Sequence, residues 1–265
     1  MISIKEKNYL FSLLKDLGKE AENIKTRKIQ YEQKKDGSPL SEADNLVNKR
    51  INEFIKKTDY QNIISEENKQ IDFVTRSSWE YFWLVDPIDG TKEFINKGDD
   101  YTINIALCKE NRPIFSIVYA PGKKELFHAE KNKGAFKNEK RIYSYQDKKT
   151  WRVVASKSHM TFETKNFIDK TCKDKKVELK NYGSSLKICK VADGTADIYP
   201  RFGPTMEWDT CAAHLILSES GGELVCSSNG NILEYNKENL LNPFFIAFAQ
   251  KLKPELFIKS FVKIT

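Results

Sequence analysis

The chain has 265 residues, of which 40% are hydrophobic, 12% aromatic and 31% charged, and it carries a formal net charge of +7 with a pI near 8.9. This composition is ordinary for a globular protein, and the length allows a sizeable core in one large domain or two modest ones. No apolar run is long enough to span a bilayer, and the N-terminal residues lack the apolar segment of a signal peptide. We therefore expect a soluble cytoplasmic protein without an integral membrane segment.

The positive charge is scattered over polar stretches such as 123–124, 131–140 and 173–176. Charge spread in this way usually marks a solvated surface, and no aromatic-rich basic platform accompanies it. We expect no nucleic-acid partner, and a nucleic-acid-binding protein is kept only as a competing hypothesis. The sequence does not decide between a monomer and a homodimer, and it is compatible with peripheral association with the inner face of the cell membrane.

The cysteines show no C-x-x-C pairing and mostly lie in apolar patterns. This predicts buried free thiols in a reducing compartment for Cys108, Cys172, Cys189, Cys211 and Cys226.

The first elements of the chain are predicted to be two amphipathic helices, the first over residues 4–24 and the second beginning at Ser41. A loop over residues 34–39 separates them by its composition. Ser41 with Asp44 three residues later has the spacing of a capping pair. A short strand is predicted at residues 62–64, and Ser65, Glu66 and Glu67 follow directly at its end.

An apolar run over residues 81–85 predicts a buried strand that stops at Asp86, because Pro87 cannot donate to a sheet ladder. Asp89, Gly90 and Thr91 are predicted to form a turn that opens a short helix. The hydrophobic period then changes to two, which predicts antiparallel strands at residues 101–108, 113–119 and 125–129.

The polar, lysine-rich stretch 131–149 is the predicted boundary between an N-terminal half, residues 1–145, and a C-terminal half, residues 146–265. The second half alternates between predicted strands and helices. The strands are expected at 153–156, 177–179, 196–199, 223–226 and 244–249, and the helices at 163–172, 185–193, 209–219 and 254–262. The pattern predicts an α/β fold of alternating helix and sheet layers.

Asp86 and Asp89 are the strongest candidates for chemistry, because they follow a buried strand and precede a glycine and a hydroxyl at a helix start. Hard oxygen ligands suit Mg²⁺, and a helix N-terminus suits phosphate, so the stretch predicts metal-assisted phosphate chemistry. A turn that uses both carboxylates for local hydrogen bonds is the alternative, although two aspartates around a proline would be an unusual way to build one. Glu66 offers a third carboxylate. Glu67 is the weaker choice, since successive side chains point in opposite directions.

Asp209 opens a predicted helix, so it is either an N-cap or a metal ligand that the fold brings to Asp89. Thr91 and Asp44 are candidates for holding an attacking water whose pKa a metal lowers. The three histidines, 128, 159 and 214, show no zinc spacing. The Asp-x-x-Asp spacing also differs from the Asp-x-Asp of haloacid-dehalogenase-type phosphatases, which favours water over an aspartate as the nucleophile.

Three blocks together resemble the inositol monophosphatase family of lithium-sensitive, magnesium-dependent phosphatases, in their order and separation, over essentially the whole chain. They are Asp86-Pro87-Ile88-Asp89-Gly90-Thr91, Ser65-Glu66-Glu67 and Trp208-Asp209. Further features resemble the 3′(2′),5′-bisphosphate nucleotidase branch of that family, namely residues 89–95, residues 183–187 and the Tyr-Pro-Arg-Phe-Gly-Pro-Thr run at 199–205.

The resemblance implies a layered α/β/α/β/α sandwich of the inositol monophosphatase and fructose-1,6-bisphosphatase type, with two or three Mg²⁺ ions per active site. The implied metal ligands are Glu66, Asp86, the Ile88 carbonyl, Asp89 and Asp209. The implied catalytic residues are Asp44, Thr91 and Glu66, with Asp44 and Thr91 orienting the water. The implied substrate contacts are Glu66, Ile88, Asp89, Gly90, Thr91, His159, Ser184, Lys187, Arg201 and Asp209.

The implied substrate is the small nucleotide adenosine 3′,5′-bisphosphate (PAP), hydrolysed to AMP and phosphate, with its sulfated relative (PAPS, to APS) as a second one. An inositol or sugar phosphatase of the same fold is the alternative. Ser184, Lys187, Arg201 and His159 match positions near the nucleotide and its second phosphate. The planar fork of Arg201 suits a phosphate, whereas a solvated surface position competes for Lys187.

Overall fold

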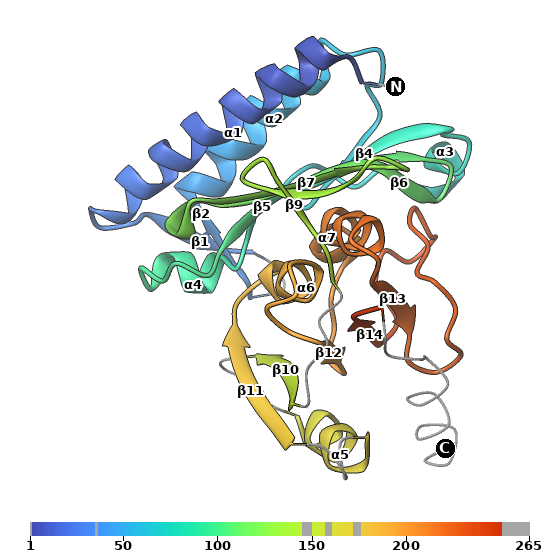
Figure 1. Ribbon diagram of the computed structural model, residues 1–265. Coiled ribbons are helices and arrows are strands. Elements are labelled where there is room, and N and C mark those ends of the chain that lie inside the picture. The colour runs from blue at the N-terminus through green and yellow to red at the C-terminus, as the bar shows by residue number, and fades with distance from the viewer. Residues whose placement is uncertain (1, 35–36, 145–149, 157–160, 172–175, 251–265) are drawn as a thin grey trace.

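The computed structural model describes residues 2–34, 37–144, 150–156, 161–171 and 176–250, and these form five alternating layers (Figure 1). Helices α1 (Ile4–Lys25) and α2 (Glu42–Ile55) form the first layer, which covers a seven-stranded sheet. Helices α6 (Leu186–Ala192) and α7 (Glu207–Glu219) lie between this sheet and a five-stranded one, and α5 (Phe162–Thr171) covers the far side. The predicted α/β/α/β/α sandwich is confirmed.

The seven-stranded sheet is antiparallel except for one parallel pair at its edge, between β3 and β4. Its strands, in order, are β3 (Ile63–Ser65), β4 (Tyr81–Asp89), β5 (Thr102–Lys109), β6 (Arg112–Ala120), β7 (Glu125–Glu130), β8 (Gly134–Lys137) and β9 (Lys140–Ile142). Alternate side chains enter two cores: Phe82 and Leu84 face α6 and α7, whereas Trp83 and Val85 face α1 and α2. Burial on both faces explains why this strand reads as a continuous apolar run.

Strand β4 does not stop at Asp86 as predicted but continues to Asp89, with a shift of register against β5 between these two residues. Residues three apart on a regular strand would point to opposite faces of the sheet. An irregularity changes that alternation, and it also accommodates Pro87, which has no N–H to donate. The irregularity therefore brings both carboxylates toward the same side.

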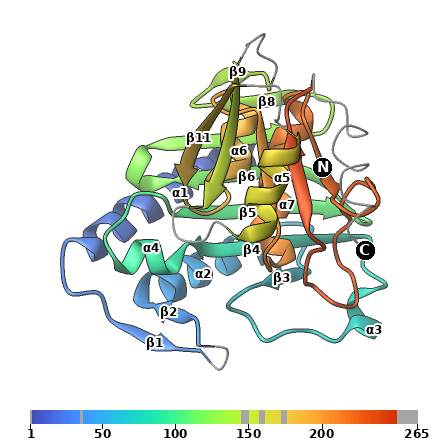
Figure 2. The ribbon, with the colours of Figure 1, turned by 90° about the horizontal axis from the view of Figure 1, so that it is seen from below.

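Several short elements were not predicted, because three or four residues are too few to show a hydrophobic period. Strands β1 (Tyr31–Gln33) and β2 (Pro39–Ser41) pair as a hairpin beside α2 and α4 (Thr91–Ile95), as Figure 2 shows. A single helical turn, α3 (Phe73–Arg76), precedes β4, and a 3₁₀ turn, η1 (Pro121–Lys123), precedes β7. Strands β8 and β9 lie within the lysine-rich stretch that we predicted to be a surface boundary, so part of that stretch belongs to the sheet.

The five-stranded sheet has the order β11-β10-β12-β14-β13. Strand β10 is parallel to β11 and β12, and β14 is antiparallel to β12 and β13. The strand bounds are β10 (Thr150–Ser156), β11 (Lys176–Tyr182), β12 (Ile198–Arg201), β13 (Glu223–Cys226) and β14 (Phe245–Phe248). The division of the chain into two halves at 145/146 stays a prediction.

Cys108, Cys189, Cys211 and Cys226 are buried free thiols, as predicted. Cys172, His159 and the helix predicted at 254–262 lie outside the described residues. Among the helices of the described ranges, none combines the length and the apolar character that a bilayer crossing requires.

Candidate active site

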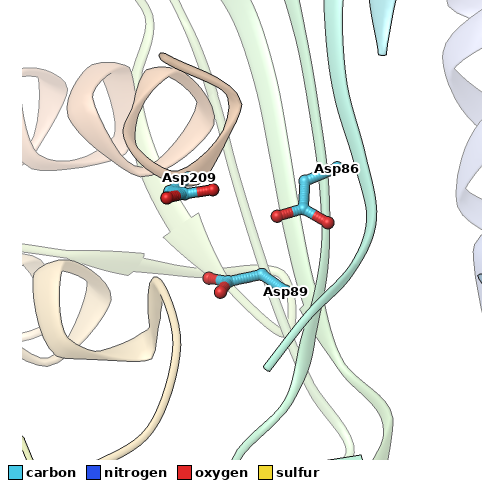
Figure 3. Close-up of side chains that lie close together, drawn as sticks. All are labelled: Asp86, Asp89 and Asp209. Atoms are coloured by element: carbon cyan, nitrogen blue, oxygen red, sulfur yellow. The ribbon is translucent and has the colours of Figure 1, made fainter. Parts of the chain in front are cut away.

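Three carboxylates from two distant segments point toward one another between the seven-stranded sheet and α7 (Figure 3). Asp86 and Asp89 belong to β4 and Asp209 to the first turn of α7, and one oxygen of each lies within 4.8 Å of the others. We call these residues the carboxylate cluster. The fold thus brings Asp209 to Asp89, which residue spacing alone could not establish.

Asp209 is not the N-cap of α7, because the helix begins two residues earlier, at Glu207. Its Oδ2 accepts a hydrogen bond from the backbone N–H of Met206 at 2.8 Å. A carboxylate in the first helical turn is favourable, because the unpaired N–H groups there carry partial positive charge. Asp209 can therefore order the helix start with one oxygen and still present a carboxylate to the cluster.

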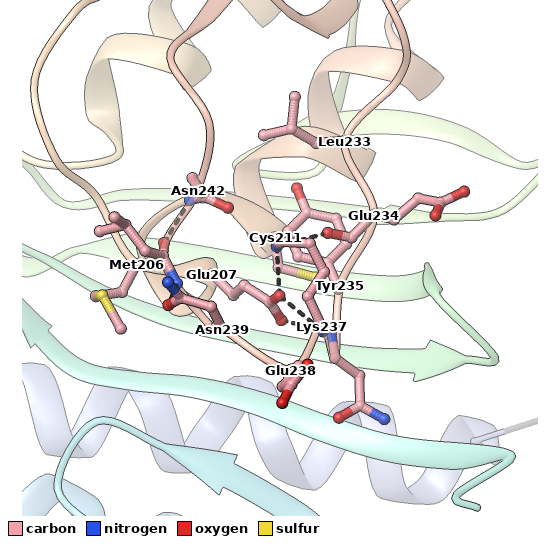
Figure 4. A network of polar contacts seen from close by, with 12 residues as sticks. Met206, Glu207, Cys211, Leu233, Glu234, Tyr235, Lys237, Glu238, Asn239 and Asn242 are labelled. Atoms are coloured by element: carbon pink, nitrogen blue, oxygen red, sulfur yellow. Dashed lines mark hydrogen bonds and ion pairs between the residues drawn. The ribbon is translucent and has the colours of Figure 1, made fainter. Parts of the chain in front are cut away.

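The loop at residues 233–242 fixes the start of α7 from the other side (Figure 4). The fully buried Glu207 accepts hydrogen bonds from the backbone N–H of Asn236 at 2.5 Å and of Lys237 at 3.0 Å, and it also pairs with the Lys237 ammonium. Asn242 donates its side-chain N–H to the Met206 carbonyl at 2.6 Å. These contacts hold the first turn of α7, and with it Asp209, in one place.

The carboxylate cluster is electrostatically unbalanced. Burial raises the pKa of Asp86 well above its ordinary value, and the charges of Glu66, Asp89 and Asp209 raise it further. Burial also raises the pKa of Asp89 to about 6 and that of Asp209 well above normal. Asp86 Oδ1 is buried without a hydrogen-bond partner among the described residues. Buried carboxylates with an orphaned oxygen fit a hard divalent cation, which would satisfy both the charge and the oxygen.

Glu66 lies at the end of β3, where its N–H donates to the Val85 carbonyl at 3.2 Å, but it is not part of the carboxylate cluster. The Lys34 ammonium is 2.6 Å from Glu66 Oε1 and 2.5 Å from Glu67 Oε1. Although burial lowers it, hydrogen bonds to both glutamates raise the pKa of Lys34. Burial raises the pKa of Glu67 to about 7. No sequence pattern pointed to Lys34, since its segment has only the composition of a loop.

Asp44 and Thr91 are brought together as a pair. The Thr91 hydroxyl lies 3.3 Å from Asp44 Oδ1 and 3.0 Å from the Ile88 carbonyl oxygen. The other Asp44 oxygen accepts the N–H and hydroxyl of Ser41 at 2.8 and 2.5 Å. Burial raises the pKa of Asp44 to about 6. The predicted capping pair is therefore confirmed, and it leaves the second carboxylate oxygen to face Thr91.

Gly90 precedes α4 with φ +90°, a left-handed conformation that side-chain-bearing residues rarely adopt. A Cβ at this position would lie 3.3 Å from the Asp100 carbonyl oxygen. No side chain caps the start of α4, and Gly90 lines the pocket described next.

A pocket of about 270 Å³ extends from the carboxylate cluster toward α6 and β12. Its lining includes Asp89, Gly90, Lys92, Glu93, Ser184, Ser185, Lys187, Tyr199, Arg201, Thr205, Asp209, Thr210 and Phe245. The predicted nucleotide-side residues Ser184, Lys187 and Arg201 thus share one pocket with two predicted metal ligands. A larger hollow of about 1060 Å³ between α1 and strands β6 to β8 contains none of the predicted site residues.

Lys187 is only 8% exposed, so its competing interpretation as a solvated surface residue is wrong. Burial lowers the pKa of its ammonium to about 8, and the ammonium lies 5.6 Å from the centre of the Tyr199 ring. Arg201 donates to the Pro204 carbonyl at 3.0 Å, and its Nε is buried without a hydrogen-bond partner among the described residues. Two cationic groups therefore line the same pocket as the carboxylates of Asp89 and Asp209.

Neither of the two histidines in the described ranges, His128 and His214, belongs to the site. His214 Nδ1 is 2.7 Å from the Tyr235 hydroxyl, and burial lowers its pKa to about 3. His128 packs between Phe11 and Phe136.

The sequence prediction missed one residue of the site, Ser185, whose backbone N–H donates to Asp89 Oδ2 at 2.5 Å. The one sequence signal for Ser185 is its place in the Gly-Ser-Ser motif, in which the family resemblance implies a role for Ser184 alone.

The model of the inositol monophosphatase family matches residues 8–265. The chain is similar to the 3′(2′),5′-bisphosphate nucleotidase CysQ of Salmonella typhimurium, with 37% identity over 222 residues that cover 82% of this chain and 88% of that protein. CysQ of Escherichia coli K12 is 36% identical over 225 residues, which cover 83% of this chain and 89% of that protein. The crystal structure of CysQ from Bacteroides thetaiotaomicron matches with a TM-score of 0.81 and 37% identity, covering 91% of this chain and 95% of that one. Since these matches extend over most of the sequence and of the fold, the chain belongs to the inositol monophosphatase family.

Proposed function

We propose that this protein is a magnesium-dependent phosphomonoesterase that hydrolyses the 3′-phosphate of adenosine 3′,5′-bisphosphate to give AMP and phosphate, and that it also converts PAPS to APS. The observation that carries the proposal is one pocket that Asp89 and Asp209 of the carboxylate cluster share with Ser184, Lys187 and Arg201. Its relatives with 36 to 37% identity bear the name 3′(2′),5′-bisphosphate nucleotidase, which supports the same substrate class here.

The residues proposed to hold two or three Mg²⁺ ions are Glu66, Asp86, the Ile88 carbonyl, Asp89 and Asp209. Their oxygen donors suit Mg²⁺, and a divalent cation would both satisfy the orphaned Asp86 oxygen and offset the burial and mutual repulsion that raise the carboxyl pKa values. When bound, Mg²⁺ would stabilise the charge that develops on the phosphate and make water a better nucleophile near neutral pH.

Asp44 and Thr91 are proposed to orient the attacking water. The Thr91 hydroxyl lies 3.3 Å from Asp44 Oδ1, so it can accept a hydrogen bond from a water beside it while it donates its own proton to Asp44, which takes up the proton as the water attacks. With a pKa of about 6, Asp44 is mostly ionised at neutral pH and is a base of suitable strength. The backbone of Gly90 and Thr91 would receive the scissile phosphate.

Lys187 and Arg201, with Ser184 and His159, are proposed to bind the nucleotide and its second phosphate. A substrate with two phosphates on one ribose could place one group at the carboxylate cluster and the other at the cationic side of the pocket. In this proposal residues 1–145 supply most metal ligands, and residues 146–265 complete the metal site and bind the nucleotide.

The test compares turnover of adenosine 3′,5′-bisphosphate with turnover of inositol 1-phosphate by the purified protein, with AMP and phosphate measured separately. We expect a clear preference for the nucleotide, and we expect Arg201→Ala to weaken nucleotide turnover much more than any turnover of the inositol ester. A preference for inositol 1-phosphate would instead support the sugar-phosphate alternative. Activity that does not depend on Mg²⁺ would contradict the metal assignment.

A further inference from the structure

Three buried polar residues that are hydrogen-bonded to one another lie next to the Asp89 carboxylate. Thr102 and Asn104, on β5, are 0% and 1% exposed, and Ser185, immediately before α6, is 3% exposed. The hydroxyls of Thr102 and Ser185 are 2.9 Å apart, and the Ser185 hydroxyl donates to the Asn104 side-chain carbonyl at 2.8 Å. We call these three residues the β5–α6 clamp.

One end of the clamp holds a proposed metal ligand. Asp89 Oδ2 accepts the Ser185 backbone N–H at 2.5 Å, and the Asn104 side-chain N–H approaches the same oxygen at 3.5 Å. A carboxylate that receives fixed N–H donors on one oxygen is restricted in its orientation, which determines where its other oxygen can point. The clamp therefore acts on the direction in which Asp89 faces the pocket.

The other end of the clamp holds the proposed nucleotide side. Thr102 donates to the Ser184 hydroxyl at 3.1 Å, and Ser184 has φ +45°, a conformation that surrounding contacts must maintain. Just before it, the Gly183 N–H donates to Asp100 Oδ2 at 3.1 Å, and a Cβ on Gly183 would lie 2.5 Å from the Asp100 carbonyl oxygen. The segment that carries Ser184 and Lys187 is thus packed tightly against the start of β5.

We propose that Thr102, Asn104 and Ser185 are positioning residues that couple Asp89 to the segment Ser184–Lys187, so that metal binding and nucleotide binding strengthen each other. Ordering Asp89 orders Ser185 through their direct hydrogen bond, and ordering Ser184 orders the same clamp from the opposite side. Each ligand then lowers the conformational entropy that the other must remove, and the coupling must be equal in both directions. The inference rests on the proposed function, because it requires that a nucleotide bind this pocket.

The test uses Thr102→Val, which removes the hydroxyl at nearly constant volume, and Thr102→Ser, which retains it. The matched control is Ser116→Ala, because Ser116 is also buried on the same sheet but its hydroxyl has no hydrogen-bond partner among the described residues. Calorimetry would measure AMP affinity with and without Mg²⁺. The Mg²⁺-induced shift in melting temperature without nucleotide would give a second readout that does not depend on turnover.

For the wild-type protein and for Ser116→Ala, we expect Mg²⁺ to tighten AMP binding by roughly tenfold. Thr102→Val should reduce this factor to less than about threefold, and Thr102→Ser should restore it. Any direct contact between metal and AMP is common to all four proteins. Differences among them in the factor by which Mg²⁺ tightens AMP binding therefore measure the contribution of the β5–α6 clamp. If Thr102→Val did not fold, Ser185→Ala would replace it, since that change retains the backbone N–H that Asp89 accepts.

The inference is overturned if Thr102→Val, or Ser185→Ala in its place, shows the same coupling factor as the wild-type protein. It is also overturned if AMP binding to the wild type does not depend on Mg²⁺. In either case, turnover of adenosine 3′,5′-bisphosphate by the wild-type protein would show that the proposed function stands and that only the coupling has failed. Absence of that turnover would contradict the proposed function itself.

Discussion

Two clusters of charged side chains in the same molecule solve the problem of burial in opposite ways. Where β7 and β8 meet α6, Glu125 lies 2.8 Å from the Lys137 ammonium and 2.6 Å from the Lys190 ammonium, and Asp193 lies 3.0 Å from Lys137. Although burial alone would raise it, these hydrogen bonds lower the pKa of Glu125 below its usual range. This group of two acids and two bases is neutral by itself.

The carboxylate cluster has no such balance, and the pKa values of its three members are all raised. The cations that act on it are Lys187, which lowers the pKa of Asp89, and Arg201, which lowers that of Asp209, and neither offsets the effect of burial. Buried charge alone therefore does not mark a functional site. Buried charges that pair with one another can serve the fold alone, whereas buried carboxylates without enough paired cations are candidates for binding a cationic ligand.

The largest effect that separates the two clusters should come from Asp89→Asn. We expect turnover to fall by about a thousandfold or more while the fold is retained, because a proposed metal ligand loses its charge. Steady-state kinetics at saturating Mg²⁺, with circular dichroism as the check on folding, would measure it. Retention of most of the activity would contradict the metal role of Asp89.

A change in the balanced cluster around Glu125 should lower the stability of the protein and leave its turnover unchanged. Glu125→Gln leaves the ammonium groups of Lys137 and Lys190 with less compensation, so the free energy of unfolding should fall by about 1–2 kcal/mol after allowance for partial solvent exposure. Turnover and the Mg²⁺ concentration for half-maximal activity should stay unchanged. Urea unfolding would measure the loss, and Glu139→Gln, at an exposed position in the next hairpin, would serve as the control. A large change in the Mg²⁺ requirement would show that the two clusters are not separate.

The smallest effect concerns pH in the absence of metal. The pKa of Asp89 is about 6 and those of Asp86 and Asp209 are also raised, whereas an unfolded aspartate titrates near pH 4. Between these values the folded protein binds more protons than the unfolded chain, so the contribution of the cluster to stability falls as pH rises. Asp86→Asn should therefore have a higher free energy of unfolding than the wild type at pH 7, and this difference, the stability gap, should shrink toward pH 5.

Urea unfolding of both proteins in EDTA across this pH range would measure the gap. Addition of Mg²⁺ should remove or reverse it, because only the wild-type cluster can exchange its protons for the cation. A gap that does not vary with pH would mean that Asp86 is not protonated in the metal-free fold.

Sequence patterns predicted the long elements and the layered fold, because helices and paired strands of this length have clear hydrophobic periods. They failed at the end of β4. The end of the apolar run and Pro87 predicted that the strand stops at Asp86, but the strand continues to Asp89 with an irregular register. They also failed for Lys34 and Asn104, whose importance lies in side chains from remote elements. No local pattern contains such a contact, and the approach of Asp209 to Asp89 could be expected only from the family resemblance.

Strand β14, formed by Phe245–Phe248, is the last strand of the described chain, yet it pairs on both sides, with β12 and β13. During synthesis from the N-terminus, the seven-stranded sheet can assemble from residues 63–142 well before β14 leaves the ribosome. Until β14 inserts, β13 has no partner strand in the sheet, and α7 has no completed layer beneath it. The nascent protein would thus carry Asp86 and Asp89 for most of its synthesis without a fixed Asp209, and the complete carboxylate cluster would form only once β14 has inserted.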